Sequence, residues 1–220
     1  MKRNNVILTD FVPSEKWDFS EQLSEATKEQ WQVKSQRTNH LHGSKFKTLL
    51  RYVGYFLFPL KIALSKVKYD NILAWQQFYG LNYTFFARIL HLRKRSRVFV
   101  MTFIYKPKAG FLGKVYSSYI HYIVEGKYVD KLICFSRNEC LYYKNLFKKV
   151  EDKFVYIPLG ISVTNTLDSE VEKGQYLFTT GRSNRDYDFL LDTLGNTDCE
   201  LQIACDSLNI RGGVLQRFVR

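Results

Sequence analysis

A loop near the end of the sequence combines residue types that bind anions. Within YLFTTGRSNRDYDFLL, Gly181, Arg182, Ser183 and Arg185 lie between a strand-like segment and an amphipathic helical pattern. Glycine lets the backbone come close to a ligand, a helix start offers free N–H groups, and guanidinium groups bind phosphate oxygens. These residues predict a phosphate or diphosphate site. The alternative is an ordinary strand-to-helix turn with exposed arginines and Ser183 as its cap.

Short apolar segments of β type alternate with longer helical patterns, which favours parallel strands joined by helices. Most of these segments are continuously apolar, as in strands covered on both faces. The sequence therefore predicts an α/β fold, a Rossmann-like parallel sheet with helices on both faces. The expected strands are Val6–Thr9, Asn71–Trp75, Val98–Thr102, Lys131–Phe135, Phe154–Ile157, Tyr176–Thr180 and Leu201–Ala204, with Trp31–Val33 as a possible addition. The expected helices are Lys45–Ser65, Leu81–His91, Leu112–Glu125, Glu139–Phe147 and Asp186–Leu194.

A polar, acidic segment without periodicity separates two parts of this pattern. We expect a first domain at residues 1–160, a linker at 161–175 and an incomplete second domain at 176–220. Before the linker, Ser136 and Glu139 form a capping box directly after a strand, which predicts a strand-to-helix junction there.

Charge is distributed unevenly along the chain. The net charge is +12, but residues 30–124 hold sixteen lysines and arginines and a single acid, Asp70. Such a segment suggests a polyanionic partner, either nucleic acid or an anionic membrane, although a merely solvated basic surface remains an alternative. The most apolar run is nine uncharged residues between Arg51 and Lys61. It is far shorter than the ~20 residues that span a bilayer, so it can lie on a membrane. With no secretion signal, we expect a cytoplasmic protein.

The four cysteines do not have the spacing of a zinc or redox motif. Cys134 and Cys140, like Cys199 and Cys205, are separated by five residues. Buried, reduced thiols are therefore the favoured interpretation for the cysteines in or beside strands, Cys134 and Cys205.

Two segments resemble one family of enzymes. YLFTTGRSNRDYDFLL resembles the start of the carboxyl-terminal domain of GT-B glycosyltransferases of the family-4 kind, where a strand ends in Gly-Arg and a basic pair holds the donor diphosphate. VDKLICFSRNECLYYKNLF followed by KFVYIPLGIS is similar to the end of the amino-terminal domain of these enzymes. The matches stand in the family's order, from about residue 129 to 205. The resemblance implies a GT-B type fold, in which the first β-α-β of a second Rossmann-like domain follows the sheet.

The resemblance also implies roles for individual residues. Gly181, Arg182, Ser183 and Arg185 would contact the diphosphate of a nucleotide sugar. Other strand ends would line the cleft, at Asp10, Thr102 and Ser136. The first domain would bind the acceptor, and its basic residues would contact the membrane and a lipid-linked acceptor: Lys45, Lys47, Arg51, Lys61, Arg93, Lys94, Arg95 and Arg97.

The resemblance to these glycosyltransferases does not require a bound metal. Asp186 and Asp188 formally match the Asp-x-Asp of the other glycosyltransferase architecture, which binds a metal. Their position in a first helical turn, where the helix dipole favours acids, is the simpler account. We therefore expect a nucleotide sugar as cosubstrate, no cofactor and no obligatory metal. No catalytic residue is assigned.

The function expected from these observations is transfer of a sugar from a nucleotide sugar to a polyprenyl-diphosphate-linked glycan in capsule, exopolysaccharide or cell-wall synthesis, at the inner face of the plasma membrane. The chain ends before the paired glutamates of the family's donor domain, so we expect a truncated enzyme with weak or absent activity. The alternatives are a basic nucleic-acid-binding protein and a non-catalytic partner of a complete glycosyltransferase.

Overall fold

The computed structural model describes residues 3–38, 44–160, 174–181, 186–195 and 197–204. They belong to two compact units, Met1–Ser162 and Val163–Arg220. Of the predicted site, Arg182, Ser183 and Arg185 lie outside the described residues, as does Cys205.

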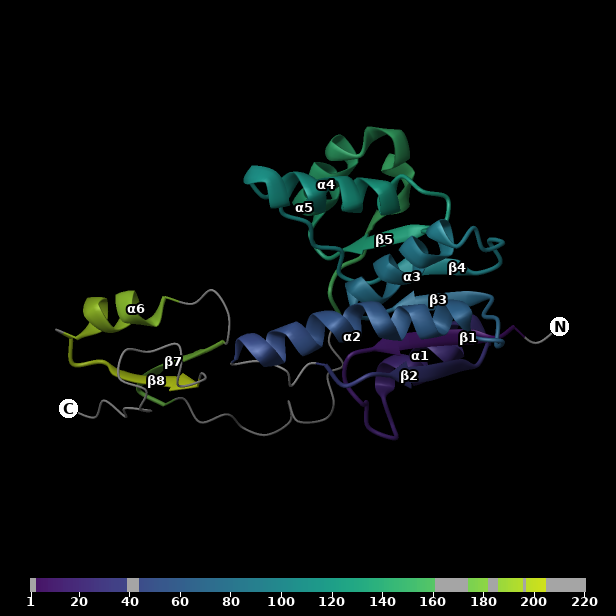
Figure 1. The fold of residues 1–220 in the computed structure, drawn as a ribbon. Coiled ribbons are helices and arrows are strands. Elements are labelled where there is room, and N and C mark those ends of the chain that lie inside the picture. The colour runs from purple at the N-terminus through teal and green to yellow at the C-terminus, as the bar shows by residue number, and fades with distance from the viewer. Residues whose placement is uncertain (1–2, 39–43, 161–173, 182–185, 196, 205–220) are drawn as a thin grey trace. The chain divides into compact units, whose positions relative to one another are not determined.

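The first unit is built on one parallel sheet with the strand order β2-β1-β3-β4-β5-β6 (Figure 1). Its strands are β1 (Asn5–Thr9), β2 (Trp31–Ser35), β3 (Asn71–Ala74), β4 (Arg97–Val100), β5 (Lys131–Cys134) and β6 (Phe154–Tyr156). Its helices are α1 (Asp18–Thr27), α2 (Lys45–Leu64), α3 (Gln77–Ile89), α4 (Gly110–Val124) and α5 (Arg137–Leu146), followed by a 3-10 helix at Lys148–Lys153. The prediction of a Rossmann-like α/β fold with a parallel sheet is confirmed.

The order of strands contains one reversal. The chain leaves β1 for β2 on one side and then returns to β3 on the other side, after which β4, β5 and β6 follow in order. In open parallel sheets, ligands bind at the carboxyl ends of the strands beside such a reversal. The topology therefore makes the loops after β1 and β3 the first candidates for a binding site.

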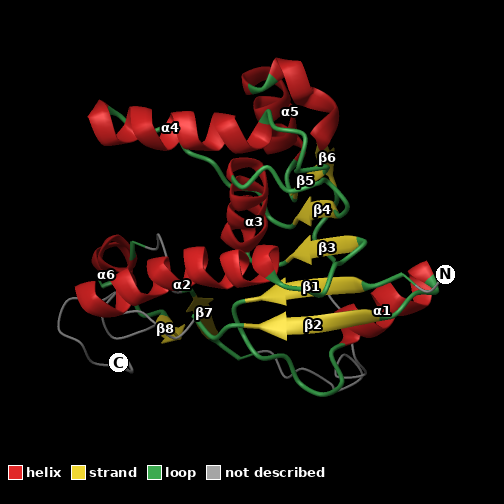
Figure 2. Cartoon of the chain, turned by 45° about the vertical axis from the view of Figure 1, so that its right-hand side comes forward, coloured by secondary structure: helices red, strands yellow, loops and turns green. Residues whose placement is uncertain are grey.

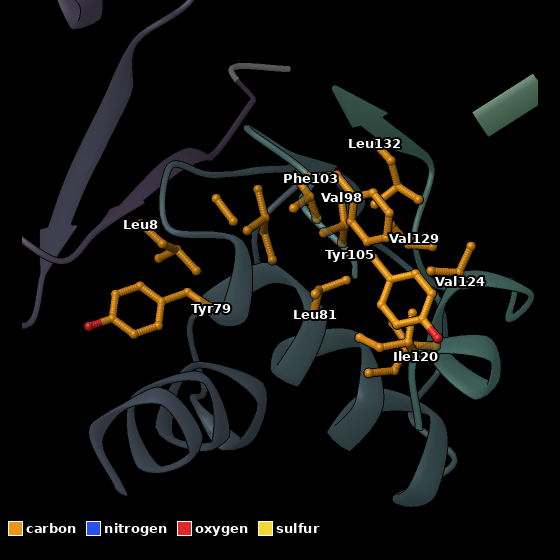
Figure 3. Close-up of a cluster of buried hydrophobic side chains, with 14 of the residues drawn as sticks. Leu8, Tyr79, Leu81, Val98, Phe103, Tyr105, Ile120, Val124, Val129 and Leu132 are labelled. Atoms are coloured by element: carbon orange, nitrogen blue, oxygen red, sulfur yellow. The ribbon is translucent and has the colours of Figure 1, made fainter. Parts of the chain in front are cut away.

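The core explains why the strands are continuously apolar. Val6 and Leu8 face one side of the sheet and Ile7 faces the other, yet all three are fully buried. The face with Leu8 packs on α3 and α4, through Leu81 and Ile120 among others (Figure 3). Both faces of β1 are thus covered.

Helix α3 lies unusually close to the sheet. A Cβ added at Gly80 would lie 2.7 Å from Val100 Cγ2 and 2.8 Å from Ala74 Cβ. These distances are shorter than real Cβ contacts, so the packing of α3 against β3 and β4 depends on a glycine at this position.

Two helices differ from the sequence prediction. Helix α1 was not predicted, although Phe19, Leu23 and Ala26 recur at i, i+4 and i+7 in Asp18–Thr27; the segment is polar overall and buries no residue. Helix α3 begins at Gln77 rather than at Leu81, because Gln76 caps it by accepting a hydrogen bond from the Phe78 N–H through its side chain.

The described residues of the second unit form one β-α-β. Strand β7 (Tyr176–Thr180) pairs in parallel with β8 (Glu200–Ala204), and α6 (Tyr187–Leu194) connects them. Helix α6 is capped by the Asp186 side chain, which accepts a hydrogen bond from the Phe189 N–H at 3.0 Å. The cap is therefore Asp186 and not Ser183.

Candidate functional site

Polar side chains from three elements meet at the reversal point of the sheet. Asp10 directly follows β1, and Gln76 follows β3 as the cap of α3. The Gln76 amide nitrogen lies 3.3 Å from Asp10 Oδ2 and 3.3 Å from the Tyr55 hydroxyl of α2. The amide orientation is fixed because its oxygen accepts the Phe78 N–H, so its N–H groups face the carboxylate and the phenol.

Thr38 and Tyr79 extend this hydrogen-bonded arrangement toward the segment after β2. The Thr38 backbone N–H donates to the Asp10 carbonyl at 3.0 Å. The Tyr79 hydroxyl donates to the Gln36 carbonyl at 2.9 Å, so Thr38 Oγ1, 3.1 Å away, must donate to Tyr79. We call Asp10, Thr38, Tyr55, Gln76 and Tyr79 the switch-point cluster.

Electrostatics hold the phenols of this cluster in their neutral form. Burial raises the pKa of Tyr55, an effect that the nearby Arg51 charge opposes and the Asp10 carboxylate increases. Burial also raises the pKa of Tyr79 from 10.0 to about 12, against the bond from Thr38. At neutral pH the cluster thus contains a carboxylate and neutral hydroxyls, with the Arg51 cation near Tyr55. Thr38 and Tyr79 are fully buried, so a ligand would meet the partly exposed side chains of Asp10 and Gln76, which can accept and donate hydrogen bonds.

The three predicted cleft residues all follow strands at the carboxyl edge. Asp10 follows β1, Thr102 comes shortly after β4, and Ser136 comes shortly after β5. Neighbouring strands are about 4.8 Å apart, and β3 separates β1 from β4, so Asp10 and Thr102 lie at strand ends about 10 Å apart. Ser136 is one strand further and caps α5 through a contact with the Glu139 N–H at 3.5 Å. The structure brings the three residues to one edge but not into one cluster.

Thr102 has an unusual backbone conformation. Its φ of 55° lies in the left-handed region, which β-branched residues rarely occupy. Such a residue costs on the order of 1–3 kcal/mol, and strain of this kind is concentrated at functional sites. The loop after β4 is held in this shape by backbone bonds from Met101 to Ala74 and from Phe103 to Ile133.

Of the predicted diphosphate loop, the structure describes its first residue. Gly181 has a φ of 155°, which an L side chain rarely adopts, and its carbonyl accepts a bond from the Tyr187 hydroxyl at 2.9 Å. Gly181 is therefore tied to the start of α6. Asp186 is used as the helix cap. In the described part of the chain, no group of three or more His, Cys, Asp or Glu residues is placed to hold a metal ion.

The predicted membrane and acceptor residues are divided between the two edges of the sheet. Lys45, Lys47 and Arg51 lie in the first half of α2, which follows β2 at the carboxyl edge. Lys61 is 16 residues after Lys45 in this helix, which places the two about 24 Å apart at 1.5 Å per residue. With it, at the edge where the strands begin, are the other four: Arg93, Lys94, Arg95 and Arg97.

Sequence reasoning missed most of the switch-point cluster. Gln76 could have been predicted, because it comes directly after an expected strand. Thr38, Tyr55 and Tyr79 carry no local signal, since only the return of the chain across β1 brings them to Asp10. No model of a known protein family matches this sequence, and no curated protein matches it significantly.

Proposed function

We propose that the chain is a glycosyltransferase of GT-B type that works at a membrane surface, moving a sugar from a nucleotide sugar to a lipid-linked glycan. The observation that carries this proposal is helix α2. Its first half exposes apolar and cationic side chains, and the same stretch contributes Tyr55 to the switch-point cluster. One helix thus joins a surface suited to lipid with a site suited to sugar.

The outer face of α2 has the composition of an interfacial helix. Phe46 and Leu49 are 68% and 57% exposed, and Lys45 and Lys47 are exposed beside them. The row continues with the exposed side chains of Tyr52, Val53, Phe56 and Leu57. A continuous exposed apolar surface marks an interaction site, and flanking lysines add attraction to anionic lipid headgroups.

Helix α4 offers a second surface of the same kind. Phe111 and Leu112 are 79% and 80% exposed in its first turn, and Val115 is 52% exposed. The exposed Lys108 and Lys114 flank them. The first turns of α2 and α4 project beyond the ends of the strands, in the same direction (Figure 2). Two apolar contacts would hold the carboxyl edge of the sheet next to the lipid.

Membrane contact of this type requires no spanning segment. In the part of the chain that the structure describes, no helix has the length and apolar character needed to cross a bilayer. An amphipathic surface that lies on the headgroups accounts for exposed apolar residues that occur together with cations. We place this association at the cytoplasmic face, where nucleotide sugars and anionic lipids meet.

The chemistry divides between the two units. In the transfer, an acceptor hydroxyl oxygen bonds to the anomeric carbon, the bond to the diphosphate breaks, and the hydroxyl proton leaves to a base. The switch-point cluster would bind the acceptor sugar, with Asp10 as a carboxylate that accepts a hydrogen bond from it. Arg182 and Arg185 would offset the charge that develops on the departing diphosphate.

Flotation with lipid vesicles tests the membrane part of the proposal. The protein is mixed with vesicles of phosphatidylcholine alone or with added phosphatidylglycerol, and the floated fraction is measured. We expect flotation with the anionic vesicles, and a loss of about 30-fold or more in apparent affinity for Phe46→Ser/Phe111→Ser, because each buried apolar side chain contributes on the order of 1–2 kcal/mol.

A matched variant controls for the loss of apolar surface as such. Leu141 and Tyr142 are 60% and 49% exposed and belong to α5, not to the first turns of α2 and α4. Leu141→Ser/Tyr142→Ser should float like the unchanged protein. Equal losses in both double variants would contradict a specific membrane face. Strong retention on single-stranded RNA at physiological salt without vesicle binding would favour the nucleic-acid alternative instead.

Ligand binding tests the donor part. Titration with uridine, guanosine and thymidine diphosphates should reveal binding of one of them, weakened about tenfold or more in Arg182→Gln/Arg185→Gln, since charge-assisted bonds contribute about 1.5–3 kcal/mol each. Lys148→Gln/Lys149→Gln removes the same formal charge from an exposed part of the first unit and should bind normally. Absence of binding to every diphosphate would argue against a donor site.

A further inference from the structure

A pocket lies at the edge of the sheet where the strands begin, opposite the switch-point cluster. Its volume is about 230 Å³. Tyr69 precedes β3, Ser96 precedes β4 and Tyr128 precedes β5, and all three line it. The last turn of α2 and the end of α3 complete the wall, through Ile62 and Leu92 among others.

The inner wall of this pocket is apolar and aromatic. Ala63, Ala87 and Val98 line it together with the rings of Tyr83 and Tyr128. Two of the hydroxyl protons are already used within the protein, because Ser96 Oγ donates to the Tyr69 carbonyl at 2.6 Å and the Tyr128 hydroxyl donates to the Leu92 carbonyl at 2.7 Å. The Tyr83 hydroxyl therefore donates to Ser96 Oγ, 3.2 Å away. The Tyr69 hydroxyl is buried and has no hydrogen-bond partner among the described residues, so a ligand part placed here would meet mainly rings and methyl groups, with this one unused donor among the lining residues.

The rim, in contrast, is cationic. It is formed by Lys68, Arg93, Lys94 and Arg95, and the described residues that line the pocket include no carboxylate. Lys94 is paired with Asp130 at 2.7 Å. Arg93 and Arg95 are exposed, and neither forms a hydrogen bond or ion pair with any residue that the structure describes. Two guanidinium groups thus stand at the mouth of the pocket with their donors available.

Helix dipoles explain only part of this charge. The carboxyl ends of α2 and α3 lie at this edge and attract cations. Lys68 serves in this way, because its Nζ donates to the Ser65 carbonyl at the end of α2, at 2.6 Å. Arg93 and Arg95 do not bond to such carbonyls among the described residues. The guanidinium groups of both arginines are therefore free to bind a ligand.

We propose that this pocket binds a phosphorylated ligand with a small aromatic or aliphatic body, at a site separate from the proposed transferase centre. Arg93 and Arg95 hold the phosphate, for which planar guanidinium groups are well matched. The body fills the space beside Tyr83 and Tyr128. An apolar cavity of about 150 Å³ accepts benzene, so the volume here is sufficient for one ring or a short chain.

The probes are inorganic phosphate, phenyl phosphate and phenol, titrated into the full chain and followed by calorimetry. We expect phenyl phosphate to bind at least about tenfold more tightly than either phosphate or phenol, because it uses both the cationic rim and the apolar wall. Arg93→Gln/Arg95→Gln should weaken phenyl phosphate about tenfold or more. Both side chains are exposed, so this variant should fold normally, which a thermal scan verifies.

Controls separate the pocket from general charge and from lipid. Lys148→Gln/Lys149→Gln should bind phenyl phosphate like the unchanged protein, and equal weakening in the two double variants would overturn the proposal. Equal affinities for phosphate and phenyl phosphate would also overturn it, since no pocket would then be involved. The last control uses anionic vesicles. If vesicles bind through Arg93 and Arg95 while phenyl phosphate does not bind, the two arginines contact lipid headgroups and the pocket proposal is wrong.

Discussion

The Asn82 side-chain amide donates to the Tyr55 carbonyl at 2.6 Å, and so replaces a bond that α2 cannot make. Pro59, four residues after Tyr55, has no N–H to donate to that carbonyl. Asn82 is fully buried on α3, and its own carbonyl oxygen accepts a bond from the Tyr119 hydroxyl of α4. A single amide therefore repairs α2 and joins three helices.

Replacing Asn82 should reveal this role. Asn82→Leu leaves the Tyr55 carbonyl and the Tyr119 hydroxyl without their partner and should lower the free energy of unfolding by about 3 kcal/mol. Pro59→Ala supplies the missing N–H, so the loss caused by Asn82→Leu should be about 1 kcal/mol smaller in that background. Urea unfolding of the four proteins measures the coupling. An identical loss in both backgrounds would show that Asn82 does not compensate for the proline.

Tyr79 should give the protein a defined sensitivity to alkali. Its pKa is raised from 10.0 to about 12 in the folded protein, so the stability it contributes is fully present below the unfolded pKa and is lost as the pH rises toward about 12. Tyr79→Phe removes the bond to the Gln36 carbonyl and should cost about 1 kcal/mol at neutral pH. The difference from the unchanged protein should then shrink between pH 10 and about 12 in urea unfolding. A constant difference over that range would contradict the shift.

Gly80 should be intolerant of even one methyl group. Gly80→Ala places a Cβ against Val100 and Ala74 and should lower the free energy of unfolding by about 1–3 kcal/mol, since overpacking moves the helix from the sheet. Gly160→Ala is the matched control, because a Cβ at Gly160 would meet no atom within 4 Å. It should change stability by less than about 0.5 kcal/mol. Equal effects of the two substitutions in urea unfolding would show that the close approach of α3 is unimportant.

The cysteines should differ in reactivity according to burial. Burial raises the pKa of Cys134 to about 12, so its thiol should stay protonated and react slowly with iodoacetamide at neutral pH. Cys140 is also buried, whereas Cys199 is exposed. Mass spectrometry of the alkylated native protein should therefore find Cys199 modified first, and Cys134 and Cys140 only after unfolding in urea. Rapid native labelling of Cys134 would show that the sheet opens readily at β5.

Ser136 should act as a helix cap. Ser136→Ala removes the acceptor for the Glu139 N–H and should cost about 1 kcal/mol, whereas Ser136→Asp keeps an acceptor and should be nearly neutral. Thermal unfolding of both variants distinguishes capping from a purely cleft-lining role. If Ser136→Ala is as stable as the unchanged protein, the 3.5 Å contact contributes little and the hydroxyl is available for a ligand.

The strands could be predicted well because each is covered on both faces. In β1, β3 and β5 nearly every residue is buried, so an uninterrupted apolar run is both necessary and visible in the sequence. Helix α1 could not be predicted in the same way. It buries no residue, and its apolar side chains Phe19, Leu23 and Ala26 are few among polar ones, so the helical spacing is present in the sequence but inconspicuous.

The site could be predicted only where its residues follow a strand directly. Asp10 was identified for that reason, because a parallel sheet places such residues at one edge. Tyr55 comes from the middle of a helix whose apolar pattern hides it, and its position depends on the return of the chain across β1. The basic residues were assigned to one surface from charge alone. Charge does not reveal that Lys45 and Lys61 lie about 24 Å apart, near opposite ends of helix α2.

The length of α2 is therefore constrained in a way that composition does not show. Three parts of this helix serve three different surfaces in these proposals. Phe46 in the first turn contacts lipid, Tyr55 in the middle belongs to the sugar site, and Ile62 in the last turn lines the pocket. One residue inserted after Tyr55 would turn everything before it by about 100° relative to Ile62. Natural variants should thus tolerate substitutions along this helix far better than insertions or deletions.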